Sequence, residues 1–200
     1  MSIYHFLTFV GGILTVWTFQ RYISAVVYPK DERSRPKPSR ATWLIWASLD
    51  YLLLASMYAK NAVNWQIVAC VVGATTVFIL SLKFGISGWT LTDSLCVFGG
   101  GLGLIGWIVF DNPNLAIGSS CLSVFIGSIP TFKSLFTDPT REDKLAWIIG
   151  LVSDLFIIGG IEFSKWDFAH IAQPIIFLVN SVIILFLIFL LPVFKKQPPM

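Results

Sequence analysis

Two aspartates, Asp50 and Asp154, interrupt apolar runs of the sequence, in LIWASLDYLLLAS and LVSDLF. Each follows a tryptophan by seven residues, Trp43 and Trp147 respectively, and two helical turns place each Trp/Asp pair on one helix face. An aspartate at the centre of a membrane helix costs about 3 kcal/mol, and such residues are candidates for function. The pair therefore predicts a polar site that binds a proton, a metal ion or a cationic substrate and so drives or gates solute movement.

A purely structural interpretation of the same two carboxyls stays open. Each could be neutral, or could accept a hydrogen bond from Ser48, Ser153 or a tryptophan N–H, and only hold the helices together.

Further candidates for substrate binding are polar or aromatic residues in the same apolar segments. Gln173 and Asn180 are seven residues apart and share a helix face. The rings of Trp43, Trp46 and Trp147 could stack on a ring or a cation, although packing is the alternative for each.

Two prolines are candidate hinges for gating. Pro174 removes one backbone hydrogen bond and leaves a carbonyl free near His170, while Pro130 lies near the end of its apolar segment.

The composition of the chain indicates the class of protein to which these residues belong. The 200-residue chain is 56% hydrophobic and 12% charged, whereas a soluble domain is about 25% charged. The sequence therefore predicts an all-α integral membrane protein. The three cysteines lie in apolar segments without a CxxC motif, which favours buried small side chains over metal ligands. The N-terminal segment has no basic region or cleavage pattern, so we expect a retained first helix.

Seven segments are long and apolar enough to cross a bilayer, which takes about 20 residues. They span residues 4–27, 41–58, 62–83, 89–110, 114–136, 143–162 and 168–193. The string GLGLIG matches a dinucleotide-binding motif but lies inside an apolar segment, so Gly99 and Gly103 are better explained as a helix contact surface.

The distribution of Lys and Arg predicts an N-out, C-in orientation, because cations concentrate in cytoplasmic loops. The predicted outer loops hold only Lys60 and Lys165. The predicted inner loops and tail hold Lys30, Arg33, Arg35, Lys37, Arg40, Lys83, Lys133, Arg141, Lys144, Lys195 and Lys196.

An internal repeat is also indicated. A shift of 101 residues superimposes Pro38 on Pro139, Arg40 on Arg141, and Trp46 on Trp147. The chain is thus interpreted as a first three-helix repeat (1–83), a linker helix (84–112) and a second three-helix repeat with a short tail (113–200). Because the linker is a single membrane-crossing helix, the second repeat begins on the same side of the membrane as the first. The two repeats are therefore parallel and related by an axis along the membrane normal.

The segment SIPTFKSLFTDPTREDKLAW resembles the PQ-loop pattern, in which a proline ends a helix and a short basic loop precedes a tryptophan. With the 3+1+3 architecture, the chain resembles the SWEET/PQ-loop superfamily, which includes nicotinamide riboside transporters and KDEL receptors. The literal PQ dipeptide is replaced by Pro130-Thr131 and Trp17-Thr18, which leaves the subfamily open. The resemblance implies that Asn180 lines the solute site, but the second asparagine of SWEET proteins is missing.

These features predict a transporter of a small polar solute, cationic or aromatic, that works by alternating access with proton coupling through the two aspartates. A receptor of the same fold, or a subunit of a larger complex, is the alternative. No HExxH, GxSxG or Cys/His cluster is present, so we expect neither an enzyme nor a cofactor. The expected partners are the solute, protons or a cation, and the lipid bilayer, with room for a homo-oligomer and no role for nucleic acid. The expected location is a multi-pass position in the cell membrane, the inner one in a bacterium.

Overall fold

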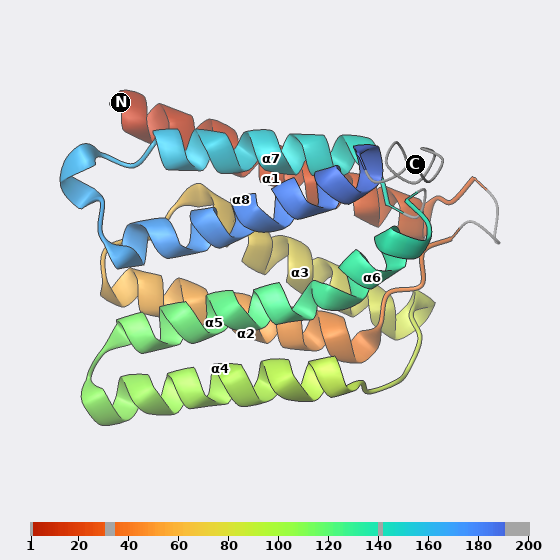
Figure 1. Cartoon of the computed structure of the whole chain (residues 1–200), viewed down its shortest axis with the longest axis horizontal. Coiled ribbons are helices and arrows are strands. Elements are labelled where there is room, and N and C mark those ends of the chain that lie inside the picture. Colours follow the sequence, from red (N-terminus) through yellow and green to blue (C-terminus); the bar gives the residue numbers. More distant parts are fainter. Residues whose placement is uncertain (1, 31–34, 140–141, 191–200) are drawn as a thin grey trace, which may run out of the picture.

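A computed structural model describes residues 2–30, 35–139 and 142–190. Every regular element in these ranges is a helix, and the helices run side by side along the long axis of the molecule (Figure 1). In chain order they are α1 (Ile3–Val27), α2 (Arg40–Ala59), α3 (Trp65–Phe84), α4 (Leu91–Phe110), α5 (Pro113–Gly127), α6 (Ile129–Thr137), α7 (Lys144–Gly159) and α8 (Phe168–Phe189), with a 3-10 turn at Phe163–Lys165 before α8.

Five stretches of helix in the described chain are long and apolar enough to cross a membrane. They are α1, α3, α4, α5 together with α6, and α8. The two remaining predicted spans, which correspond to α2 and α7, are not among these five stretches, for physical reasons. α7 has 16 residues, short for the hydrocarbon core, and α2 carries Arg40 and Asp50 among several hydroxyl side chains. The all-helical architecture predicted from the sequence is confirmed, and the five apolar stretches are consistent with an integral, multi-pass membrane protein.

Polar side chains mark where the helices begin. Ser39, Asn64 and Asp143 each accept a hydrogen bond from a backbone N–H of the first turn of α2, α3 and α7. At the start of α4, Thr90 and Asp93 form a reciprocal capping box.

The predicted segment 114–136 is divided into α5 and α6 at Ser128. Pro130 occupies the first turn of α6, where its missing N–H interrupts the hydrogen bonding of a continuous helix. The candidate hinge at Pro130 therefore coincides with a break in the helix.

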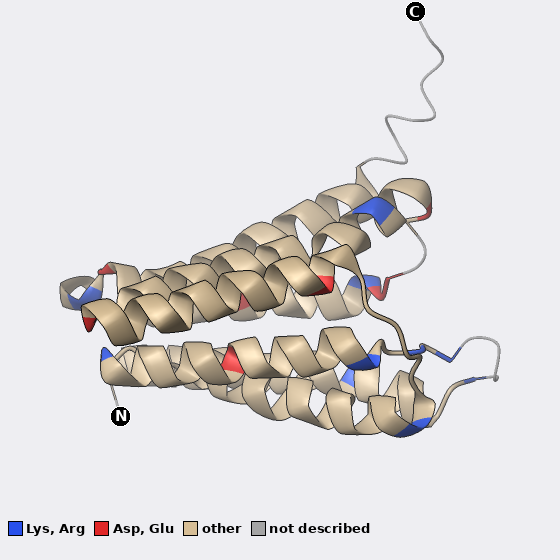
Figure 2. Cartoon of the chain, turned by 90° about the horizontal axis from the view of Figure 1, so that it is seen from below, with Lys and Arg blue, Asp and Glu red and all other residues tan. Residues whose placement is uncertain are grey.

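The packing of the helices follows one pattern in both halves of the chain. In the first half α3 packs against both α1 and α2, and in the second half α8 packs against both α7 and α5. Across the halves, α1 packs on α7 and α2 packs on α5, while α4 lies against α5 and α2. Seen from a perpendicular direction, the helices form two layers (Figure 2).

Charged residues lie mostly at the two ends of the bundle (Figure 2). The end where α1 begins and α2 and α7 finish is called the outer end below, and the opposite end the inner end. Lys60 and Lys165 belong to the outer end. The described inner-end cations include Lys30, Arg35, Lys37, Arg40, Lys83, Lys133 and Lys144, whereas Arg33, Arg141, Lys195 and Lys196 lie outside the described residues.

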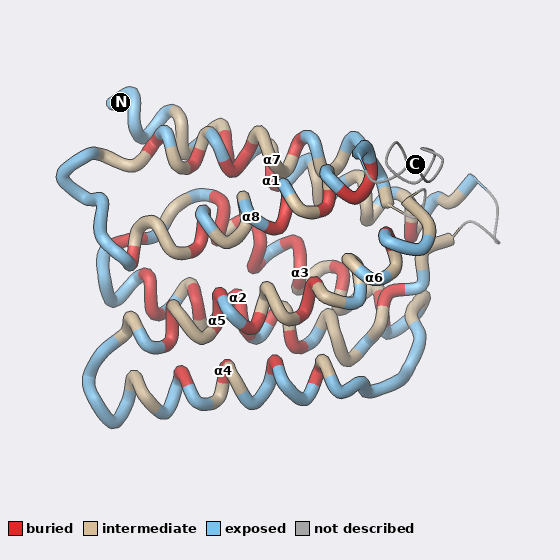
Figure 3. The backbone as a smooth tube through the Cα atoms, viewed as in Figure 1, coloured by how far each residue is buried: buried red, intermediate tan, exposed pale blue. Residues whose placement is uncertain are grey.

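Burial is concentrated where the two halves meet, and α4 is exposed along most of its outward face (Figure 3). The largest buried cluster joins Leu53, Ile67, Cys70, Ile117 and Cys121, so α2, α3 and α5 share one core. The exposed side chains of α4 are large and apolar, such as Phe98 and Ile108, as expected for contact with lipid.

The predicted contact surface of Gly99 and Gly103 faces α5. A Cβ atom on Gly99 would meet Ser123, and one on Gly103 would meet Ser119 and the backbone of Ala116. Small residues thus allow α4 and α5 to approach closely, the usual way in which membrane helices associate.

We expect Gly103→Ala to lower the free energy of unfolding by about 1–3 kcal/mol, because the new methyl group would overlap Ser119, whose Cβ is fixed to the backbone of α5 and cannot rotate away. Gly101→Ala is the matched control, since nothing lies within 4 Å of its Cβ position. Unfolding in mixed micelles at increasing SDS would measure both. Equal effects of the two substitutions would contradict the proposed contact.

Candidate functional site

Asp154 lies deep in the bundle with 2% of its surface exposed, and both of its carboxyl oxygens accept hydrogen bonds. Gln66 on α3 donates to Oδ1 at 2.7 Å, and Ser181 on α8 donates to Oδ2 at 2.8 Å. The carboxyl of α7 thereby connects helices from both halves of the chain, and each of its oxygens has a hydrogen-bond donor.

A chain of amide hydrogen bonds runs from Asp154 toward the outer end. Gln173 Nε2 donates to Gln66 Oε1 at 2.8 Å, and Asn64 Nδ2 donates to Gln173 Oε1 at 2.8 Å. Gln66 and Gln173 are fully buried. Every donor in this chain points toward Asp154, so the amide dipoles are aligned in one direction.

Ser153 forms a second link between the halves beside this network. Its hydroxyl donates to the Gly11 carbonyl of α1 at 2.8 Å and lies 2.8 Å from Thr15 Oγ1. Ser153 thus fixes α7 on α1 and does not bond to Asp154. Ser48, the other serine considered as a partner, donates to Leu44 of its own helix.

Asp50 differs from Asp154 in having no partner. Its surface is 6% exposed, and no described residue forms a hydrogen bond or ion pair with it. A buried carboxyl without donors is costly, because it has lost water without gaining a replacement.

Two other predicted site residues carry unpartnered polar atoms. Trp46 Nε1 and Asn180 Oδ1 are enclosed and have no hydrogen-bond partner in the described chain. A Cβ on Gly127 of α5 would contact the Trp46 indole, which places the ring between α2 and α5.

The unpartnered groups of Asp50 and Asn180 lie at similar depth. Asp50 is ten residues from the inner start of α2, and Asn180 is nine residues from the inner end of α8, which corresponds to about 14–15 Å in each case. Asp154 is also ten residues from the inner start of its helix. The middle of the bundle therefore holds one satisfied carboxyl, Asp154, and the unpartnered polar groups of Asp50 on α2 and Asn180 on α8.

The remaining predicted tryptophans lie nearer the inner end. Trp43 packs with its ring centroid 5.3 Å from Tyr22 and 5.3 Å from Trp46, and 6.5 Å from Phe19. Trp147 donates its N–H to Glu142 at 3.1 Å and packs against α6 and α8. Both rings therefore close the inner half of the bundle. Pro174 is buried within α8, which continues through it as a single helix.

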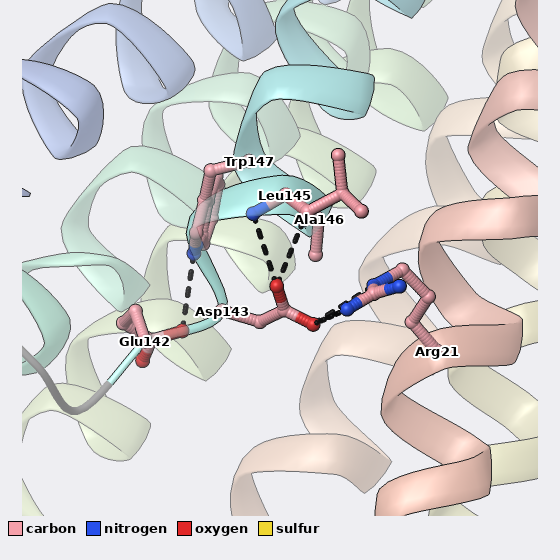
Figure 4. A network of polar contacts seen from close by, with 6 residues as sticks. All are labelled: Arg21, Glu142, Asp143, Leu145, Ala146 and Trp147. Atoms are coloured by element: carbon pink, nitrogen blue, oxygen red, sulfur yellow. Dashed lines mark hydrogen bonds and ion pairs between the residues drawn. The ribbon is translucent and has the colours of Figure 1, made fainter.

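An ion pair crosses between the halves at the inner end (Figure 4). Arg21 on α1 donates to Asp143 Oδ2 through Nε at 2.8 Å and Nη2 at 2.6 Å. The other oxygen of Asp143 caps α7 by accepting from the N–H groups of Leu145 and Ala146. Although burial acts to raise the pKa of Asp143, Arg21 and the capping N–H groups hold it below its ordinary value. Burial raises the pKa of the neighbouring Glu142 despite its bond to Trp147.

Loss of this ion pair is expected to loosen the inner end only. Arg21→Gln and Asp143→Asn should each accelerate amide exchange in the inner turns of α1 and α7 about two- to fivefold, because exposed pairs contribute up to about 1 kcal/mol. Asn retains the helix cap, so the second variant removes charge alone.

The same experiment has a defined pH dependence. Because the folded-state pKa of Asp143 is lowered, the pair stabilises the folded state above the ordinary aspartate pKa of about 4 and is lost as pH falls through the lower folded value. The ratio of the amide exchange rate in each variant to that in wild type should thus be constant between pH 5 and 8. Additive effects in the double variant would show that the two residues act separately.

Sequence reasoning named Asp154 and Gln173 of the buried hydrogen-bonded chain but missed the residues that bond to them. Gln66, Ser181 and Asn64 hold Asp154 and Gln173 in place, and none was a candidate. Gln66 had a usable signal, since it is an amide in the outer turn of an otherwise apolar helix. Ser181 directly follows Asn180, and its role depends on how α8 faces α7, which spacing alone does not specify.

The fold and the buried polar network define an all-helical protein with the character of an integral, multi-pass membrane protein. No protein family, curated protein or solved structure matches the chain.

Proposed function

We propose that this chain is a membrane transporter that moves a small polar solute by alternating access. In this proposal all seven long segments cross the membrane, with the N-terminus outside and α4 as the linker between two parallel three-helix repeats. The SWEET/PQ-loop resemblance seen in the sequence is part of the same proposal.

The packing pattern supports a two-repeat arrangement. The central helix of each half, α3 or α8, contacts both other long helices of that half, and the contact of α1 with α7 corresponds to that of α5 with α2. The starts of α2 and α7, Arg40 and Lys144, are 104 residues apart. The same shift places Trp43 on Trp147 and Asp50 on Asp154, so the two carboxyls would be true counterparts.

The observation that carries the proposal is the contrast between these counterparts. Asp154 is fully hydrogen-bonded, whereas Asp50 is buried without a partner in the described chain, and an unpartnered atom of Asn180 lies at comparable depth. An ionisable group kept unpaired in a membrane bundle is expected to bind a proton or a cation during function. In this proposal Asp50 and Asn180 belong to the ligand site, and the hydrogen-bonded Asp154 supplies a rigid support.

Closure of the inner end supports alternating access. The Arg21–Asp143 pair and the Phe19, Tyr22, Trp43 and Trp46 rings lie on the inner side of the two carboxyls. The break before Pro130 gives α6 a point about which the inner end can move. Opening there would require separation of α1 from α7 and bending at α6.

The test separates transport from binding. Purified protein would be screened for thermal stabilisation by sugars, amino acids, nucleosides, vitamins and amines at about pH 5.5 and 7.5, and each hit would be assayed for uptake into proteoliposomes. Uptake above that of empty liposomes supports a transporter. Saturable binding of a solute with no uptake would favour a receptor of the same fold and overturn the proposal.

A further inference from the structure

The first half of the chain carries a group of cations at its inner end, on two segments that are bonded to each other. The segment that leads into α2 runs alongside the end of α3, where the N–H of Ile86 donates to the Pro38 carbonyl and the N–H of Arg40 donates to the Ile86 carbonyl, both at 3.0 Å. Ser39 and Ile86 thereby form a parallel bridge. A Cβ atom on Gly85 would collide with the Pro38 carbonyl oxygen, so this close approach requires glycine. The two segments are therefore held in a fixed relative position.

Cations from both segments are positioned by this structure. Arg35 donates to a carbonyl in the last turn of α1 at 2.6 Å, and its guanidinium lies 4.8 Å from the centre of the Phe84 ring. The ammonium group of Lys83 lies 5.1 Å from the centre of the same ring. Arg40 donates through Nε to a carbonyl in the last turn of α3 at 3.2 Å, and Lys37 is exposed beside the bridge. These four cations, called the inner basic surface below, adjoin the ends of two apolar helices, α1 and α3.

Little negative charge offsets the inner basic surface. Within the described ranges, no ion pair involves Lys37, Arg40 or Lys83. Asp93 at the start of α4 is buried, and both of its oxygens accept from threonine hydroxyls rather than from a cation. Residues 28–40 contain five Lys or Arg against two acids, a net charge of +3, and the two acids lie outside the described residues. The surface is therefore suited to an anionic partner.

Exposed apolar side chains beside these cations indicate what kind of anion binds. Ile86 and Trp89 in the α3–α4 loop and Leu91 at the start of α4 are each more than half exposed. The indole of Trp89 is held in place by its N–H, which donates to Ser94 at 2.7 Å. Tryptophan is enriched at the level of the lipid headgroups. A lipid can contact the cations and the apolar side chains together, whereas a free phosphate ion would leave the apolar side chains in water.

We propose that the inner basic surface binds the phosphate of an anionic phospholipid headgroup, with Lys37 and Lys83 as the exposed cations that reach it. Basic clusters immediately next to membrane helices attract anionic headgroups, and each Lys or Arg adds to the affinity. The side chains of Ile86, Trp89 and Leu91 would lie against the glycerol and upper acyl region of the same lipid. This inference requires that the chain spans a membrane, but it does not require that the chain transports a solute.

The experiment measures the binding of radiolabelled lipid to immobilised full-length protein in detergent micelles. Dioleoylphosphatidylglycerol is compared with dioleoylphosphatidylcholine, which has the same acyl chains but no net charge. The test variant is the double substitution Lys37→Gln/Lys83→Gln. The matched control is Lys133→Gln/Lys144→Gln, which removes the same charge from exposed lysines at the same end, but in the second half and beside Asp143. Thermal melting would confirm that both variants are folded.

We expect wild-type protein to bind phosphatidylglycerol at least about tenfold more tightly than phosphatidylcholine. Lys37→Gln/Lys83→Gln should reduce this preference to about twofold or less, because the two exposed cations of the surface are lost. Lys133→Gln/Lys144→Gln should keep the preference within about threefold of wild type. A preference that survives in the first variant, or that falls equally in both, would overturn the inference.

Competition with inorganic phosphate distinguishes a lipid from a free anion. Sodium phosphate at about 10 mM, compared with sodium chloride of equal ionic strength, should change phosphatidylglycerol binding less than about twofold. Displacement of the lipid by phosphate would show that the surface recognises the free anion and would overturn the assignment to a lipid. Because no step of this test measures solute uptake, its outcome is separate from that of the proposed transport function.

Discussion

Alanine at position 154 is expected to destabilise the protein by about 2–5 kcal/mol, while alanine at position 50 is expected to be neutral or stabilising by about 1 kcal/mol. Asp154→Ala leaves the buried Ser181 hydroxyl without its acceptor and leaves the Gln66 amide with only a long, 3.4 Å bond to Ser153, and a buried donor that loses its acceptor costs about 1–3 kcal/mol. Asp50→Ala removes a desolvated carboxyl that no described residue stabilises. The two truncations delete the same atoms, so their cavity terms are similar.

Reversible unfolding in mixed micelles would measure both free energies under one condition. Asp154→Asn provides a control for the network, since its carbonyl oxygen can still accept from Gln66 while its amide group can no longer accept from Ser181. That variant should lie between wild type and Asp154→Ala. Equal destabilisation by the two alanine substitutions would mean that Asp50 has a partner, and the contrast on which the proposed function depends would be lost.

Much of the fold followed from the sequence because its strongest signals are physical necessities of a bilayer. Long apolar runs must be helical, since lipid offers no hydrogen bonds to the backbone, and polar caps such as Ser39 and Asp143 mark where helices begin. Boundaries were less certain where these signals conflict. The predicted segment 143–162 includes Gly160, which lies beyond α7, and 114–136 runs through the break at Ser128.

The site was only partly predictable, because spacing places a residue on a face but does not say which helix meets that face. Asp50 and Asp154 share the Trp-x6-Asp pattern, and sequence reasoning treated them as a pair of equals. The structure distinguishes them through residues on other helices: Gln66 and Ser181 reach Asp154, and no described donor reaches Asp50. Such asymmetry arises from tertiary packing between helices, which one sequence without relatives does not encode in a readable pattern.

Solute uptake is the property that should change most strongly when Asp50 is substituted. We expect Asp50→Asn to reduce uptake driven by a pH gradient at least about 100-fold, because the amide has the shape of the carboxyl but neither ionises nor carries a proton. Asp50→Glu should retain part of the activity. Ser48→Ala is the control on the same helix, since its exposed hydroxyl bonds only to Leu44 of its own turn. The assay is initial uptake into proteoliposomes of the first solute that the binding screen identifies.

Exchange between internal and external solute then distinguishes the two possible roles of Asp50. If Asp50 carries the coupling proton, Asp50→Asn should abolish gradient-driven accumulation but preserve exchange, because exchange needs no net proton movement. If Asp50 binds the solute cation directly, both activities should fall together, since the ligand loses its countercharge in the middle of the membrane. Wild-type rates of accumulation and exchange in Asp50→Asn would exclude both roles and leave Asp50 as a costly residue without a function in transport.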